Sequence, residues 1–258
     1  MRYLSSSNLL EYMTCPRQFA YRRIAHLSLV HPPSHMFAIQ ARTHIRRVTT
    51  GILSFIYEKF AAAKQMGTDN LRHLIDLHNN TLQRYWNGKG VETYISYLEE
   101  AIYSLIEYFL DKFCFTSDQR DIPVSIPIML YQIIASPALG LVGQPSAVFQ
   151  HADGTVLVLI QSWRDSHKDM EKMGVQAAIY NQILTSMGFQ NTEFFYVNYQ
   201  SSEIVYRSVT PDDVTLLDQT LSDIEEQYFE GEFPRSAAPP CGSCEYFLLC
   251  ETRQKVIY

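Results

Sequence analysis

Apolar side chains in the first 120 residues recur at the spacing of helices. Between residues 94 and 110 they return every three or four positions, which is typical of a helix with one buried face. The same spacing over residues 51–85 predicts further helices. Residues 5–21 predict two shorter helices that meet at Cys15-Pro16, because proline is well suited to the first turn of a helix. The first half of the chain is therefore expected to be helical.

The pattern changes to strand-like runs after Asp121. Asp153-Gly154 is a strong hairpin signal between two of these runs. Helical spacing returns over residues 168–187, just before Gly188, and over residues 210–229. This order predicts an α/β domain with an antiparallel hairpin in a mixed sheet flanked by helices. The expected strands are residues 122–134, 139–150, 155–163, 192–198 and 203–209.

The composition fits one large globular domain. The chain has 258 residues, of which 47% are hydrophobic and 13% aromatic. No apolar run approaches the length of a membrane span, and the N-terminus lacks the apolar core of a signal peptide, which predicts a cytoplasmic location. We expect a single domain over residues 1–258, divided into N-terminal helices (1–50), a helical insertion (51–120), a sheet core (121–209) and a C-terminal helix with a cysteine-rich segment (210–258).

Charge is segregated along the chain, although the net charge is −6. Residues 1–50 hold seven arginines and a single acid, Glu11, whereas residues 212–232 hold eight acids and no base. Arginine is suited to bidentate contact with phosphate, so one face could meet a polyanion. The alternative is that these arginines pair with acids across the fold.

Four of the five cysteines lie close to the chain ends. Cys15 is near the start, and Cys241, Cys244 and Cys250 share one short segment near the end. A CxxC pair in a chain without a secretory signal indicates a metal or redox site, and four thiolates suit a soft metal centre. Such a site would clip the two ends of the chain together. Cys114 lies on an apolar helical run and is expected to be a core residue.

Five motifs occur in a recognisable order over nearly the whole length. They are Leu4-Ser5-Ser6-Ser7 with Cys15-Pro16-Arg17-Gln18-Phe19, the helical His44, Gly143 with the strand 157–163, the pair Gln176 and Tyr180, and Gly231-Glu232-Phe233-Pro234 with the last three cysteines. Together they resemble the RecB-like branch of the PD-(D/E)XK nuclease superfamily. The resemblance is strongest to its four-cysteine iron–sulfur members, which include CRISPR-associated exonucleases and the nuclease domains of some DNA-repair helicases.

The resemblance implies a cofactor at the cysteines. Cys15, Cys241, Cys244 and Cys250 would hold a [4Fe–4S] cluster with a structural role that joins the two termini. Zinc is the alternative, because four thiolates also suit that ion.

The residues that would carry hydrolysis in this family are changed here. The family uses carboxylates from two adjacent strands to hold divalent cations, with a nearby lysine to orient the nucleophile. At those positions the chain has Ser146, Gln161 and Trp163, none of them charged. Mg²⁺ is usually held by carboxylates, so we expect the site to bind Mg²⁺ or Mn²⁺ poorly. Asp165 and Asp169, close downstream, are the main candidates for a displaced catalytic site.

A ligand cleft could persist without catalysis. We expect nucleic acid, single-stranded or duplex, to be contacted by a stacking surface and by basic residues. The ordinary alternatives are a core-packed Tyr180, a solvated Gln176, and a histidine at position 44 with no ligand. The expected contacts are Arg42, His44, Arg46, Arg47, Arg164, Gln176 and Tyr180, with Trp163 as a further stacking residue.

Three functions follow from this pattern. The first is a degenerate nuclease that keeps its fold and cluster but serves as a nucleic-acid-binding or scaffold protein, for example beside an active nuclease or helicase. The second is a divergent metal-dependent exonuclease that uses Asp165 or Asp169. The third is a redox-responsive regulator in which the cluster is the sensor.

Overall fold

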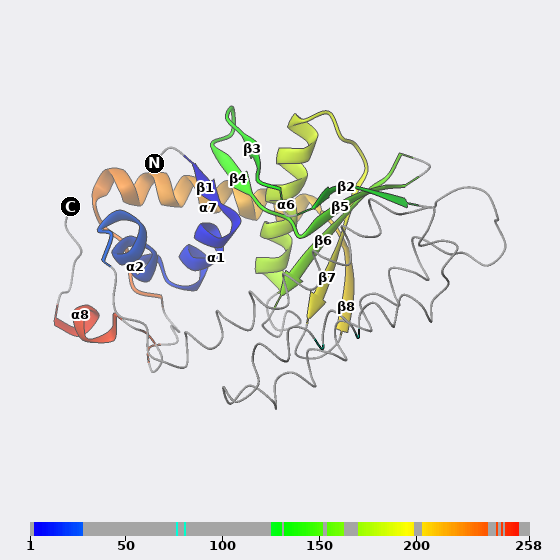
Figure 1. Ribbon diagram of the computed structural model, residues 1–258. Coiled ribbons are helices and arrows are strands. Elements are labelled where there is room, and N and C mark those ends of the chain that lie inside the picture. The colour runs from blue at the N-terminus through cyan, green and yellow to red at the C-terminus, as the bar shows by residue number, and fades with distance from the viewer. Residues whose placement is uncertain are drawn as a thin grey trace, which may run out of the picture.

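The computed structural model describes two sheets packed around one central helix (Figure 1). The larger sheet has the strand order β2-β5-β6-β7-β8. Its pairs are antiparallel except β6 and β7, which are parallel, so the predicted mixed sheet with an antiparallel hairpin is confirmed. The strands are β2 (Ser125–Leu130), β5 (Ala147–His151), β6 (Val156–Ser162), β7 (Thr192–Asn198) and β8 (Glu203–Ser208). The described residues are 3–27, 76, 80, 125–130, 132–151, 154–162, 170–198, 203–236, 241, 244 and 246–252.

A smaller sheet joins the N-terminus to the middle of the chain. Its order is β1-β4-β3, with β1 (Leu4–Ser5) parallel to β4 (Leu141–Gly143) and β3 (Ile134–Ser136) antiparallel to β4. The single strand predicted over residues 139–150 is therefore wrong. It divides into β4 and β5, which belong to different sheets, and Pro145 lies in the break because proline offers no N–H to a strand ladder. The strand predicted over residues 122–134 likewise divides into β2 and β3.

The N-terminal helices begin where the sequence predicts. Ser5 caps α1 (Ser6–Thr14) by accepting a hydrogen bond from the Asn8 N–H, and Pro16 opens α2 (Pro16–Phe19). The chain continues as a short π-helix, η1 (Ala20–Ile24), which no signal in the sequence predicts. The helices predicted within residues 36–120 lie outside the described residues, apart from the helical Asp76 and Asn80.

Helix α6 (Met170–Ser186) occupies the centre of the molecule. It contacts α1 and α7 (Pro211–Glu230), both strands β3 and β4 of the small sheet, and β7 and β8 of the large one. Most of its residues from Met173 to Leu184 are buried, which follows from this position between layers. Its alanines allow close packing, and Gly188 at φ +93° follows its last turn as predicted. In the part of the chain that the structure covers, helices are too short or too polar to cross a membrane.

Gly174 permits α7 to begin against α6. A Cβ at this position would lie 1.8 Å from Asp213 Oδ1 and 2.5 Å from Arg207 Nη2. Asp213 forms a capping box with Thr210 at the start of α7 and an ion pair with Arg207 of β8. The glycine therefore makes room for the buried pair that joins β8, α7 and α6.

Candidate functional site

Ser146 lies at the start of β5, beside the end of β6. Its N–H donates to the Leu159 carbonyl at 3.0 Å, and the next residue, Ala147, is also paired with Leu159. Ser146 and Ala147 therefore both lie opposite Leu159 of β6, two residues before Gln161. Ser146 is 8% exposed, so its hydroxyl lies in a largely enclosed position.

The structure brings the two predicted positions Ser146 and Gln161 to the same end of the β5–β6 hairpin. Gln161 is the second-to-last residue of β6, and its backbone is in register with Val197 of β7. This is the end at which the resemblance predicts the carboxylates that would hold a hard cation between adjacent strands. The predicted residues Arg42, His44, Arg46, Arg47, Trp163, Arg164, Asp165 and Asp169 lie outside the described part of the chain.

Tyr180 is packed into the core next to this end of the hairpin. It is 3% exposed, and its hydroxyl lies 3.3 Å from Ser6 Oγ. Burial raises the pKa of Tyr180, while hydrogen bonds with Ser6, Gln176 and the backbone of Gln144 act in the opposite direction. Gly143, at the end of β4, leaves the space that the tyrosine ring fills. Tyr180 therefore packs in the core, which was the alternative to a role in ligand binding. Gln176 is half-buried.

The four terminal cysteines line one hollow. Cys15 comes from the junction of α1 and α2, and the other three come from the C-terminal segment that ends in α8 (Phe247–Thr252). All four are free thiols, and Cys15 is buried. The hollow is lined by Cys15, Arg17, Gln18, Tyr21, Arg235, Cys241, Cys244, Tyr246, Phe247 and Cys250. The structure therefore brings together cysteines that are more than two hundred positions apart in the sequence.

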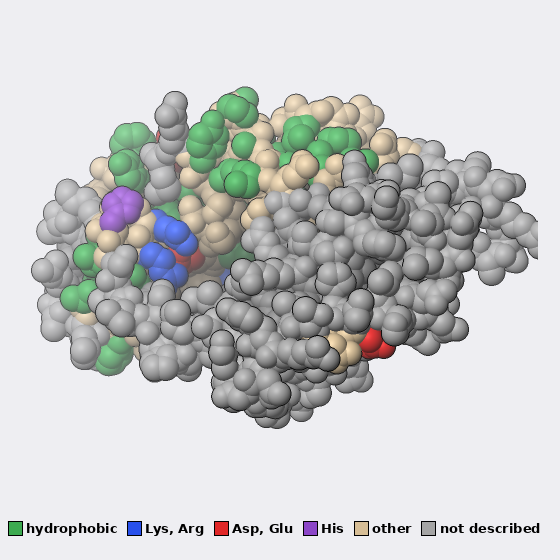
Figure 2. Space-filling model, in the orientation of Figure 1, with side chains coloured by type: hydrophobic (Ala, Val, Ile, Leu, Met, Phe, Trp, Pro, Cys, Tyr) green, Lys and Arg blue, Asp and Glu red, His purple; other side chains and the backbone are tan. Residues whose placement is uncertain are grey.

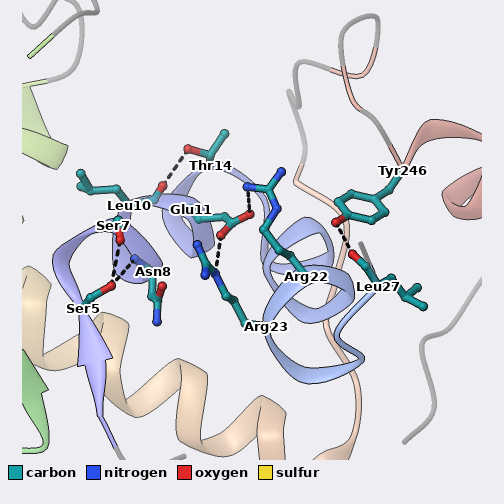
Figure 3. A network of polar contacts seen from close by, with 10 residues as sticks. All are labelled: Ser5, Ser7, Asn8, Leu10, Glu11, Thr14, Arg22, Arg23, Leu27 and Tyr246. Atoms are coloured by element: carbon teal, nitrogen blue, oxygen red, sulfur yellow. Dashed lines mark hydrogen bonds and ion pairs between the residues drawn. The ribbon is translucent and has the colours of Figure 1, made fainter. Parts of the chain in front are cut away.

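Two tyrosines attach the C-terminal segment to the N-terminal one. The rings of Tyr21 and Tyr246 stack with centroids 5.4 Å apart and an angle of 29° between their planes. The Tyr246 hydroxyl donates to the Leu27 carbonyl at 2.7 Å (Figure 3), and the Tyr21 hydroxyl donates to the Leu249 carbonyl at 3.4 Å. These contacts hold α8 beside α2 and η1 (Figure 1), and sequence reasoning did not identify either tyrosine.

Local turns shape the cysteine segment itself. The Cys244 N–H donates to the Cys241 carbonyl at 3.1 Å, and the Cys250 N–H donates to the Tyr246 carbonyl at 2.9 Å. Burial raises the pKa of the Cys244 thiol, and the nearby Cys15, Cys241 and Cys250 raise it further. Within the described residues, no three Cys, His, Asp or Glu side chains are arranged to hold one metal ion.

Two arginines donate hydrogen bonds to cysteine sulfurs. Arg17 Nη1 lies 3.8 Å from Cys250 Sγ, and Arg235 Nη2 lies 2.9 Å from Cys241 Sγ. Arg17 is also anchored by its Nε, which donates to the Phe233 carbonyl at 3.1 Å. The cysteine hollow is therefore bordered by positive charge as well as by aromatic rings.

Two other N-terminal arginines pair with the acid of their own segment. Glu11 Oε1 lies 2.6 Å from Arg22 Nη1, and Glu11 Oε2 lies 3.0 Å from Arg23 Nε (Figure 3). Arg22 also lies over the Tyr246 ring, 5.9 Å from its centroid. The basic side chains on the face shown in Figure 2 gather mainly in one patch near these helices. For this pair of arginines the structure shows internal pairing, which was the alternative to a polyanion-binding face.

The family of this chain is shown by one comparison, with protein-family models. The model of the PD-(D/E)XK nuclease superfamily matches residues 3–251. Curated protein sequences contain no match to this chain. Among solved structures, the protein SSO0001 is similar over 97% of this chain and 86% of its own, with 12% identity and a TM-score of 0.39. A candidate exonuclease from Eubacterium rectale is similar over 89% of this chain and 79% of its own, with 14% identity and a TM-score of 0.39.

Proposed function

Because this chain belongs to the PD-(D/E)XK nuclease superfamily, we propose that it is a member that has lost hydrolysis and now binds nucleic acid. It would act as a binding or scaffold component, alone or beside a partner such as an active nuclease or helicase. By the resemblance, the β5–β6 hairpin corresponds to the two strands on which the superfamily carries its metal-binding carboxylates. The loss of hydrolysis is supported by the residues Ser146 and Gln161, which lie at the end of that hairpin.

The observation that carries this proposal is that Ser146 and Gln161 lie at the same end of the hairpin and neither is charged. A divalent cation in this position needs carboxylates to hold it and to activate water. A hydroxyl and an amide offer oxygen atoms without negative charge, so they compensate poorly for the hydration that Mg²⁺ would lose. Trp163 replaces the lysine that would orient the nucleophile.

We also propose that Cys15, Cys241, Cys244 and Cys250 hold a [4Fe–4S] cluster, as in the RecB-like iron–sulfur branch. The donor set fits, because four free thiols line one hollow and two of the sulfurs accept N–H bonds. Zinc is the alternative, because four thiolates also suit that ion, and the resemblance to the iron–sulfur branch is what favours the cluster. When bound, the cluster supplies a covalent link between the chain ends.

The first experiment is a nuclease assay on protein purified without oxygen and shown to contain iron. Single-stranded and duplex DNA are incubated with Mg²⁺ and with Mn²⁺, and binding to the same DNA is measured in parallel. We expect binding without cleavage. Cleavage that disappears in Asp165→Ala or Asp169→Ala would replace this proposal with the divergent exonuclease.

Metal analysis tests the cofactor separately. About four irons per chain and a brown visible absorption are expected. One zinc per chain and no iron would reject the cluster but leave the loss of hydrolysis standing. Identical DNA affinity with oxidised and reduced clusters would exclude the redox-responsive regulator.

A further inference from the structure

Arg17 and Arg235 reach the cysteine site from two segments of the chain. We propose that both are positioning residues that donate N–H···S hydrogen bonds to thiolates of the bound cluster and thereby raise its reduction potential. The inference rests on the cluster proposed above. It assigns to both arginines a role toward the cluster that the sequence motifs do not indicate.

Arg17 is held in place by contacts with the segment that precedes the cysteines. Its backbone N–H donates to the Pro234 carbonyl at 3.2 Å, and its Nε donates to the Phe233 carbonyl at 3.1 Å. The Nε contact fixes the side chain, and the backbone contact fixes the residue, along the segment that leads to the cysteines. Nη1 is then 3.8 Å from Cys250 Sγ, so the contact joins positions 233 residues apart.

Arg235 makes the shorter contact. Its Nη2 lies 2.9 Å from Cys241 Sγ, only six residues further along the chain. The two arginines therefore serve two different cysteines, one in each half of the C-terminal motif. Cys15 and Cys244 receive no such contact from an arginine in the described part of the protein.

Reduction adds one negative charge to a cluster that already has four thiolate ligands. An N–H donor and a positive charge next to a ligand sulfur stabilise the more negative, reduced form, so each arginine should raise the potential. Arginine stays protonated at all accessible pH values, so this effect should not titrate. Arg235 lies closer to its sulfur, but it is exposed, whereas Arg17 is half-buried. Solvent screens an exposed charge more strongly, which offsets the shorter N···S distance of Arg235. We therefore expect effects of similar size from the two residues.

The test compares potentials in variants that differ by one arginine. Wild type, Arg17→Gln and Arg235→Gln are purified without oxygen and matched for iron content. Their clusters are titrated with a one-electron chemical reductant and followed by visible absorption and electron paramagnetic resonance. We expect each variant to need a lower potential for reduction, with the ratio of reduced to oxidised cluster about tenfold smaller at a fixed potential, which is about 59 mV for one electron.

Arg23→Gln is the matched control. Arg23 is on the same N-terminal segment, but it pairs with Glu11 and does not line the cysteine hollow. Its loss removes the same charge without removing an N–H···S bond, so the potential should stay within error of wild type. A shift in this control as large as that of Arg17→Gln would show that only general charge matters and would overturn the specific assignment.

A purely structural role for Arg17 predicts a different result. If Arg17 only ties α2 to the C-terminal segment, Arg17→Gln would lower cluster content or stability while the potential of the remaining cluster stayed unchanged. Should Arg17→Gln fail to fold, Arg235→Gln and the charge-keeping Arg17→Lys decide the matter. Arg17→Lys should remain nearer to the wild-type potential than Arg235→Gln. Unchanged potentials in iron-loaded variants would overturn the inference and leave the cluster intact, whereas wild type without iron would overturn both.

Discussion

Gly143 lies directly against the ring of Tyr180. A Cβ on the glycine would come within 2.4 Å of Tyr180 Cε1 and 2.9 Å of Cδ1, closer than carbon atoms approach in folded proteins. The tyrosine has no room to retreat, because it is 3% exposed and its hydroxyl contacts Ser6. The contact joins β4, α6 and α1 next to the end of the β5–β6 hairpin, so it holds the candidate site in shape.

Gly143→Ala should therefore destabilise the protein. Forcing one methyl group into a packed core costs about 1–3 kcal/mol of unfolding free energy, and the buried ring makes the upper part of this range the expected one. Urea denaturation followed by circular dichroism would measure the loss.

A double-mutant cycle with Tyr180→Leu provides the control for Gly143→Ala. The smaller side chain opens space, so Gly143→Ala should cost clearly less in that background. An equal cost in both backgrounds would show that the ring is not what excludes a side chain at this position.

The buried pair of Arg207 and Asp213 should make stability depend on pH at the acid end. Burial alone would raise the pKa of Asp213, but hydrogen bonds from Thr210 and the ion pair with Arg207 outweigh it and lower the pKa. A lowered pKa means that the contribution to stability is complete above the ordinary carboxyl pKa and is lost as pH falls through the lowered one. Asp213→Asn should cost about 1–3 kcal/mol at neutral pH.

The pH dependence separates this pair from a simple loss of capping. The difference in unfolding free energy between wild type and Asp213→Asn should shrink as pH is lowered from 5 toward 2. Asp218→Asn, on the same helix but with the acid outside the capping box, should show little difference at any pH. A constant gap between wild type and Asp213→Asn over the whole range would mean that the carboxylate charge is not the source of the stability.

Several of these features follow from sequence patterns alone. The strand-like runs and the Asp153-Gly154 turn predicted the β5–β6 hairpin, and the cap residues predicted where α1 and α7 begin. The spacing of the cysteines predicted that both chain ends meet. The turn and cap signals are local in the sequence. The cysteine signal is carried by a residue type that has few other uses in such a cluster.

The contacts that complete the site could not be predicted in the same way. The Tyr21–Tyr246 stack and the bond from Arg17 to Cys250 join segments more than two hundred residues apart. A periodic pattern reports that a tyrosine is buried but not which ring it meets. The need for glycine at position 174 is not visible in the sequence either. A side chain there would occupy the space filled by Asp213, which comes from another helix.

Loss of one of the four cysteines proposed to bind the cluster should loosen the join between the chain ends. Cys15→Ser should purify with little iron and should unfold more easily by about 3–5 kcal/mol, the size expected in the chain-entropy account for opening a very long loop. Iron content and thermal unfolding would measure the two effects. Cys114→Ala is the control, since the sequence predicts this cysteine to be outside the site. If Cys15→Ser kept its full iron content, Cys15 would not be a ligand.

Restoring charge at the hairpin end should restore metal binding before it restores cleavage. In Ser146→Asp with Gln161→Glu, two carboxylates would stand on adjacent strands, the arrangement that holds a divalent cation. We expect this double variant to bind Mn²⁺ at least tenfold more tightly than wild type, as measured by calorimetry or by the resonance of free Mn²⁺. Adding Trp163→Lys should then permit slow metal-dependent cleavage of DNA. Wild type that binds Mn²⁺ as tightly as the double variant would show that other residues hold the ion, and the loss of hydrolysis could no longer be argued from Ser146 and Gln161.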